Sequence, residues 1–158
     1  MENVLSVVIG GIGGQGVLKA SAILSEAVFR AGYDVKQSEV HGMSQRGGSV
    51  ISEVRFGKEV FSPMTPVGEA DYLVILQDDQ VEPNRHLLKK DGTLIAPDAV
   101  DEAKLPDRRA LNVALVGILA KHLDIPEAVW LDALKASLPS KVLAMNEGVF
   151  KQYYGEGE

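Results

Sequence analysis

The chain has 158 residues, of which 46% are hydrophobic and 24% charged, so it can bury one core, and disordered or collagen-like proteins are excluded. Its formal net charge of −6 argues against a nucleic-acid-binding surface. The lack of cysteine excludes disulfides, thiolate nucleophiles and iron–sulfur clusters held by this chain. The first residues do not form a signal peptide and no apolar run reaches the length of a membrane span, so we expect a cytoplasmic protein without a membrane partner.

The N-terminal part of the chain alternates strands with a helix. The continuous apolar run Val4–Ile9 is typical of a strand that is buried on both faces. Apolar residues at helical spacing predict a helix over Val17–Ala31, which Gly32 ends. A more polar strand is predicted over Val35–Val40, and strict alternation predicts a half-exposed strand over Val50–Phe56.

The middle of the chain is predicted to contain a hairpin, two strands and a helix. Gly57-Lys58 is typical of a tight turn into a short strand over Glu59–Phe61, which would make the sheet mixed. A buried strand is predicted over Tyr72–Leu76. A helix over Gln80–Lys90 and a strand over Thr93–Ala96 follow, with a turn at Asp91-Gly92 between them.

The C-terminal part is predicted to be helical. The segment Arg109–Leu123 is apolar almost all round, which predicts a helix sandwiched between other elements. Two further helices begin at Pro126 and Ser140 and end near Leu138 and Tyr154. This alternation predicts a three-layer α/β/α fold with a mixed, mostly parallel sheet and a Rossmann-like first βα unit, in a single domain spanning residues 1–158.

A glycine-rich turn joins the first predicted strand to the first helix. It has the form G-x-G-x-x-G, which lets the backbone approach a phosphate and presents the free N–H groups of a helix N-terminus. The candidate cofactor-binding residues here are Gly11, Gly13, Gly14, Gln15 and Gly16. A ribose-binding acid would be Asp34, which has a suitable spacing, or Glu39, at the end of the second strand. The alternative is a tight strand–helix connection that binds nothing.

A second glycine-rich loop follows the second strand. Arg46 is flanked by Gln45 and by Gly47-Gly48. A guanidinium next to flexible backbone N–H groups suits an anion or a planar group. The alternative is a structural arginine paired with a carboxylate. The candidate binding residues of this loop are His41, Gly42, Ser44, Gln45, Arg46, Gly47 and Gly48.

Other catalytic patterns are missing from the sequence. There is no G-x-S-x-G nucleophile turn and no H-E-x-x-H motif, and the three histidines are scattered, so no catalytic or metal-ligating residue is assigned. Asp78 and Asp79 follow a buried strand and are expected to cap the next helix rather than to hold a metal ion. Met43, Trp130, Tyr153 and Tyr154 are candidates for an interface core, and the alternative is that they complete this domain's own core.

Several features occur together along the chain: Gly11-Ile-Gly-Gly-Gln-Gly16, the stretch Glu39-Val-His-Gly-Met-Ser-Gln-Arg-Gly-Gly48, the pair Ser62-Pro63, and Asn112 followed by Gly117. Together they resemble the gamma subunit or domain of 2-oxoacid:ferredoxin oxidoreductases, over essentially the whole chain. The second stretch is most similar to the small subunit of indolepyruvate ferredoxin oxidoreductase. One departure is Gln77, where the family often has a glutamate.

The resemblance implies a role as a non-catalytic subunit of a larger enzyme. Such enzymes decarboxylate a 2-oxo acid on thiamine diphosphate and Mg, pass electrons through 4Fe–4S clusters to ferredoxin, and release an acyl-CoA. Those cofactors would lie on partner subunits, and this chain would hold none of them alone. It would help to close the coenzyme A side of the active site, with Arg46 as the charged anchor. The isolated chain is expected to be inactive and able to form a homodimer.

The sequence is also compatible with two other functions. One is an independent NAD- or FAD-dependent oxidoreductase built on the glycine turn, and the other is a stand-alone binding module. For the complex, aryl pyruvates are the favoured substrates, ahead of 2-oxoglutarate, pyruvate and branched-chain oxo acids.

Overall fold

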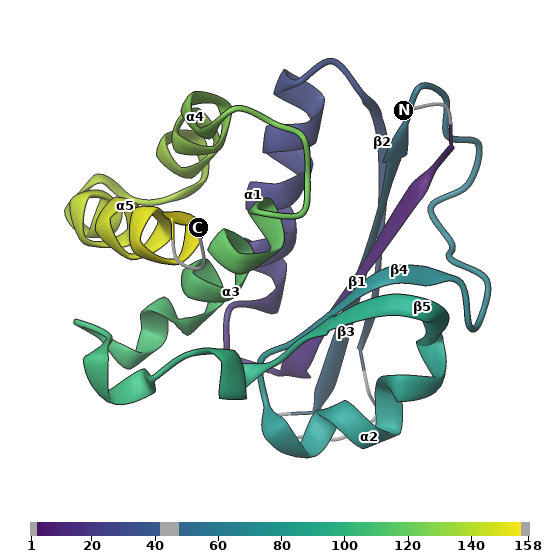
Figure 1. Ribbon diagram of the computed structural model, residues 1–158, viewed down its shortest axis with the longest axis horizontal. Helices are drawn as coiled ribbons and strands as arrows, with labels where there is room; N and C mark the ends of the chain where they lie inside the picture. The colour runs from purple at the N-terminus through teal and green to yellow at the C-terminus, as the bar shows by residue number, and fades with distance from the viewer. Residues whose placement is uncertain (1–2, 42–47, 156–158) are drawn as a thin grey trace.

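The structure is a computed structural model that describes residues 3–41 and 48–155. Within these residues, five strands form one sheet in the order β2-β3-β1-β4-β5 (Figure 1). The strands are β1 (Leu5–Ile12), β2 (Asp34–His41), β3 (Ser49–Gly57), β4 (Ala70–Ile75) and β5 (Leu88–Ile95). Strands β1, β4 and β5 pair in parallel, whereas β3 runs antiparallel between β2 and β1. The sheet is therefore mixed, as predicted, and β3 is its reversed strand.

Helices cover both faces of this sheet, which confirms the predicted three-layer arrangement. They are α1 (Val17–Arg30), α2 (Val81–Asn84), α3 (Leu111–Ala120), α4 (Glu127–Ser137) and α5 (Ser140–Gly155). Figure 1 shows α1, α3, α4 and α5 on one side of the sheet and the short α2 on the other. One layer is thus thick and the other thin.

The burial of the strands follows their sequence patterns. In β1, Val7 and Ile9 belong to the larger core beneath α1 and α3, while Val8 belongs to a smaller core on the other face. This explains the apolar run, which only Ser6 interrupts, because both faces of β1 are covered. In β3, Val54 and Phe56 are fully buried, whereas the residues that alternate with the buried ones along the strand are half-exposed, as the sequence predicts.

The predicted hairpin at Gly57-Lys58 is wrong. The segment 58–69 contains no strand, and β3 instead pairs with β2 on one side and β1 on the other. Both edges of β3 are therefore occupied, which leaves no place for a hairpin partner. Pro63 and Pro66 also lack the N–H group that a strand ladder needs. The sheet is mixed for a different reason from the one that the sequence suggested.

The predicted helix over Gln80–Lys90 is also wrong in extent. Only α2 is α-helical, and 3₁₀ turns lie before and after it. Strand β5 already begins at Leu88, so Asp91-Gly92 lies inside the strand rather than in a turn. The pairing with β4 slips between Ala70 and Tyr72, and a Cβ at Gly92 would lie 3.0 Å from the carbonyl oxygen of Ala70. Glycine therefore permits an irregular strand where the sequence indicates a turn.

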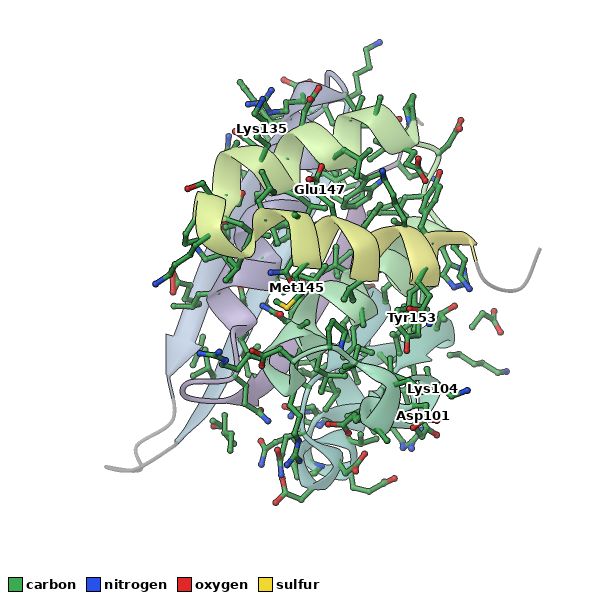
Figure 2. The ribbon with its side chains drawn as sticks, turned by 90° about the vertical axis from the view of Figure 1, so that its left-hand side faces the viewer. Asp101, Lys104, Lys135, Met145, Glu147 and Tyr153 are labelled. Carbon is green, nitrogen blue, oxygen red and sulfur yellow. The ribbon has the colours of Figure 1, made fainter. Side chains whose placement is uncertain are left out.

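The C-terminal helices agree with their predictions. Every residue of α3 except Ile118 is buried, as its all-round apolar surface predicts. Figure 2 shows α4 and α5 across the front of the thick layer, with Met145 and Tyr153 on the side of α5 toward α3. Trp130 and Tyr153 are buried in this chain's own core, so for these two side chains the alternative of a place in the domain's own core is confirmed and the interface interpretation is wrong. Met43 lies outside the described residues. No helix in the described part is both long and apolar enough to cross a membrane.

Candidate functional site

A cleft of about 550 Å³ opens at one edge of the sheet, where the parallel strands β1, β4 and β5 have their carboxyl ends. This is the position at which α/β sheets bind ligands. The glycine turn after β1, the end of β4 and the turns after β5 form its walls. Its lining includes Gly14, Gly16, Gln77, Asp78, Glu102 and Arg108.

The glycine turn is held by the side chain of Gln15. Its Oε1 accepts a hydrogen bond from the amide of Ile12 at 2.9 Å, and its Nε2 donates to Oε1 of Gln77 at 2.7 Å. A Cβ on Gly11 would lie 2.8 Å from the same Oε1, so glycine is needed there for the close approach. Gln15 therefore ties the turn to the end of β4, and it also lines the cleft. A glutamate at position 77 would accept the same bond, so the departure from the family pattern leaves this tie possible.

The N–H groups of the turn are partly used inside the protein. The amide of Gly13 donates to the carbonyl of Gly48 at 3.0 Å, and that of Gln15 donates to Ile12 at 3.2 Å. Within the described part of the chain, the amides of Gly14 and Gly16 have no protein acceptor. Both residues have φ of +88°, which glycine adopts without strain. Among the contacts of the described residues, these two amides and the first turn of α1 are the part of the turn that stays available to a ligand.

The sheet brings the second loop to the same edge. His41 is the last residue of β2 and pairs with Val50, which in turn pairs with Gly11. Gly48, half-buried, accepts the bond from Gly13. The two glycine-rich segments are therefore neighbours in space. The other candidates of this loop, Gly42, Ser44, Gln45, Arg46 and Gly47, lie outside the described residues.

Asn112 supports the turn from α3. Its Nδ2 donates to the carbonyl of Gly16 at 3.2 Å, and its Oδ1 accepts the amide of Val113 at 2.9 Å. A Cβ on Gly16 would lie 2.5 Å from that Nδ2. Gly16 thus needs to be glycine both for its backbone conformation and for this contact.

Neither candidate ribose-binding acid adjoins the glycine turn. Strand β3 lies between β2 and β1, whereas in dinucleotide-binding folds the strand after the first helix lies directly beside the first strand. Asp34 is at the far end of β2, where its carboxylate accepts the amide of Val60 at 2.8 Å. That hydrogen bond lowers the pKa of the Asp34 carboxyl. Lys19, in the first turn of α1, points away from the glycine turn, since its Nζ donates to the carbonyl of Ser137 at 2.8 Å.

The opposite wall of the cleft carries both charges, because Glu102, Arg108 and Arg109 line it. Arg109 is held by Asp107, which lies outside the cleft lining and accepts the backbone N–H of Arg109 at 2.9 Å and its guanidinium at 2.8 Å. These bonds lower the pKa of Asp107 to about 2. Arg108 and Glu102 line the cleft, and no motif in the sequence marks either residue. Their position after β5 was the available signal, because β5 ends at the same sheet edge as β1.

Asp78 lies in the first 3₁₀ turn after β4, and Gln77, not an aspartate, is the N-cap residue of that turn. The predicted capping by an aspartate is therefore wrong. Asp78 and Asp79 instead lie in the first turn, where their negative charge interacts favourably with the partial positive charge of the N–H groups. Among the residues that the structure describes, no three His, Asp or Glu side chains gather closely enough to hold a metal ion.

The sequence was compared with known protein families. The family described as pyruvate ferredoxin/flavodoxin oxidoreductase matches residues 6–108, which is more than half of the chain and includes both glycine-rich segments. The chain belongs to this pyruvate ferredoxin/flavodoxin oxidoreductase family. The resemblance seen in the sequence is thereby confirmed.

Individual members of the pyruvate ferredoxin/flavodoxin oxidoreductase family are similar to it to different extents. Indolepyruvate oxidoreductase subunit IorB of Thermococcus kodakarensis is 54% identical over 89 residues, which are 55% of this chain and 43% of that protein. The match thus spans less than half of that relative. Indolepyruvate oxidoreductase subunit IorB of Archaeoglobus fulgidus is 28% identical, covering 96% of this chain and 94% of that protein.

The fold is also shared with a solved structure. The gamma subunit of a keto/oxoacid ferredoxin oxidoreductase from Geobacter sulfurreducens superimposes with a TM-score of 0.81 at 20% identity. The superposition covers 96% of this chain and 95% of that subunit. The mixed three-layer fold is therefore shared with that gamma subunit.

Proposed function

We propose that this chain is the small, gamma-type subunit of a thiamine-dependent 2-oxoacid:ferredoxin oxidoreductase complex that acts on aryl pyruvates. The observation that carries the proposal is the 54% identity to an indolepyruvate oxidoreductase subunit. The gamma-subunit fold over nearly the whole chain supports it. The proposal includes that residues 1–158 form a single domain.

The chemistry of the reaction would then belong to partner subunits. Thiamine diphosphate with Mg supplies the decarboxylation, and 4Fe–4S clusters carry the electrons to ferredoxin. This chain has no cysteine to bind a cluster, and its described residues offer no metal-binding group. Its own contribution is to shape the active site and to hold the complex together, and alone it is inactive.

The cleft supports a role on the coenzyme A side. The free amides of Gly14 and Gly16 and the guanidinium of Arg108 suit a phosphate group of the co-substrate. Arg46, on the neighbouring loop, is the proposed charged anchor for those phosphates or for the partner subunit.

A dinucleotide-dependent oxidoreductase is the less favoured function. The strand order separates Asp34 and Glu39 from the glycine turn. The side chain of Gln15 also accepts a hydrogen bond from the amide of Ile12 inside the turn. Tight binding of NAD or FAD by the isolated chain would favour that function instead. A stand-alone binding module has no specific observation in its support.

Co-purification tests the proposal. Expressed in its native host with an affinity tag, the chain should retain a brown partner subunit, with thiamine diphosphate in the eluate. In the reconstituted complex, Arg46→Ala should change the dependence of the reaction rate on the coenzyme A concentration, or lower the affinity between the subunits. Arg30→Ala, on the exposed end of α1, is the matched control. If Arg46→Ala changes neither property, the anchor role is wrong; if no thiamine- or cluster-bearing subunit is retained, the proposed function is wrong.

A further inference from the structure

A small pocket lies between α3 and α5, next to the end of α4. Its volume is about 170 Å³, and its apolar walls are formed by Val113, Leu138, Val142 and Met145. An apolar cavity of about 150 Å³ inside a protein is large enough to hold benzene. The pocket is therefore large enough for a small aromatic molecule.

Most of the polar residues that line this pocket already have partners within the chain. Asp107 and Arg109 form an ion pair, with 2.8 Å between Oδ2 and Nη2. Asn112 donates to the carbonyl of Gly16 and accepts the amide of Val113. Among the described lining residues, no charged side chain is therefore left without a partner of opposite charge.

Asn146 is the exception, because its Oδ1 is buried and has no hydrogen-bond partner within the described part of the chain. The residue is 6% exposed, and its Nδ2 donates to the carbonyl of Val142 at 2.9 Å. Since a carbonyl can only accept, this bond fixes the orientation of the Asn146 amide and leaves Oδ1 as a free acceptor. A buried acceptor without a partner lowers stability, and a ligand with one N–H or O–H group would remove that cost.

A water molecule is a poor partner for this acceptor. An ordered water needs about two to four polar partners, whereas Oδ1 of Asn146 is the one buried polar atom without a partner among the described lining residues. Nε1 of Trp130 is also buried without a partner, but Trp130 does not line the pocket. The walls favour an aromatic ring instead, since the thioether of Met145 makes favourable contacts with such rings.

Met145 also gives a ligand a way to reach the buried oxygen. Its side chain lies on the side of α5 that faces α3 (Figure 2), where it forms part of the pocket wall. A methionine side chain has three rotatable bonds and adapts to what it packs against. Rotation of Met145 would therefore open the path to Oδ1 of Asn146 without moving a helix.

We propose that this pocket, which we call the Asn146 pocket, binds a small aromatic molecule whose single N–H or O–H group donates to Oδ1 of Asn146. Among the described residues, the Asn146 pocket shares only Arg109 with the lining of the glycine-turn cleft, so it is a second site. The proposal goes beyond the proposed function and needs no partner subunit.

The test compares two molecules of the same shape on the full chain. Indole carries one N–H group, whereas benzofuran has an oxygen atom in that place and no donor. Calorimetry should show saturable binding of one indole per chain, about tenfold tighter than that of benzofuran, because benzofuran leaves Oδ1 of Asn146 unpaired. Amide NMR shifts should change at Val142 and Met145.

Two variants test the role of the acceptor. Asn146→Leu keeps a side chain of similar size and removes the acceptor, so the preference for indole over benzofuran should disappear. Asn84→Leu is the matched control, because Nδ2 of Asn84 also donates to the carbonyl four residues earlier, at 2.8 Å to Gln80, and Asn84 does not line the pocket. This control should keep the tenfold preference. Circular dichroism confirms that each variant is folded.

Three results would overturn the proposal. Indole could show no saturable binding up to its solubility limit, the wild type could bind indole and benzofuran equally, or the NMR shifts could map to the glycine turn. The comparison of the two molecules on the wild type decides the matter even where Asn146→Leu does not fold. Because the assay contains no partner subunit, each of these results leaves the proposed function as it stands.

Discussion

Asn112 lies against the backbone of Gly16, a residue 96 positions earlier in the chain, and its Nδ2 donates to the Gly16 carbonyl at 3.2 Å. The glycine turn is thereby fastened to the beginning of α3 as well as to the end of β4. Two features that the sequence presents far apart form one structural unit. The shape of the cleft depends on this unit, because Gly16 lines it.

Gly16→Ala should destabilise the protein more than Gly14→Ala. Both residues have φ of +88°, so each substitution costs about 1–2 kcal/mol in backbone strain. At Gly14 a Cβ meets nothing within 4 Å, whereas at Gly16 it would lie 2.5 Å from Nδ2 of Asn112. We expect a total loss of roughly 2–4 kcal/mol at Gly16. Urea unfolding measures both variants, and equal losses would show that the contact with Asn112 has no effect.

Asn112→Ala should lower the free energy of unfolding by about 1–2 kcal/mol, because the carbonyl of Gly16 and the amide of Val113 each lose a buried partner. The same substitution removes the atom that a Cβ at position 16 would meet. Combined with Gly16→Ala, it should therefore cost less than the sum of the two single variants. A double-mutant cycle in urea checks this, and strict additivity would contradict it.

Gly117→Ala and Gly148→Ala should act in opposite directions. A Cβ on Gly117 would lie 3.1 Å from the carbonyl oxygen of Phe150 and 3.2 Å from Cβ of Tyr153, so it would push α5 away from α3. We expect a loss of about 1–2 kcal/mol from this overpacking. Gly148 is exposed on α5 with nothing within 4 Å, and alanine there should stabilise by roughly 0.5–1 kcal/mol. Thermal unfolding of both variants is the check, and equal changes would refute the close packing.

Stability at acid pH should depend on Asp107. Hydrogen bonds from Arg109 lower the pKa of the Asp107 carboxyl to about 2 in the folded state, whereas an unfolded aspartate has a pKa of about 3.9. Its stabilising effect is therefore fully present above pH 4 or so and is lost as the pH falls through the folded-state value near 2. Asp107→Asn should lose less stability than the wild type between about pH 4 and 2. Urea midpoints across this range give the comparison, and parallel pH profiles would contradict the assignment.

Local patterns predicted most of the elements. The apolar run of β1 and the alternation of β3 each predict the burial of the strand, and the structure shows that burial. The position of β3 between β2 and β1 did not follow, because it is a long-range pairing and Gly57-Lys58 carries only a local turn signal. The same holds for β5, whose early start at Leu88 depends on pairing with β4.

The candidate site was predicted in part. The glycine turn stands out in the sequence, because glycine spacing is a local property. The bond between Gly13 and Gly48 and the place of Arg108 in the cleft wall were missed, since both depend on which strands are neighbours.

Reconstitution of activity tests the central claim most directly. The chain and the thiamine-bearing subunit, purified separately and then mixed with coenzyme A and ferredoxin, should oxidise indolepyruvate and reduce ferredoxin. Neither component should do so alone. Oxidation of an oxo acid by the isolated chain, or turnover of NAD by it, would contradict the account.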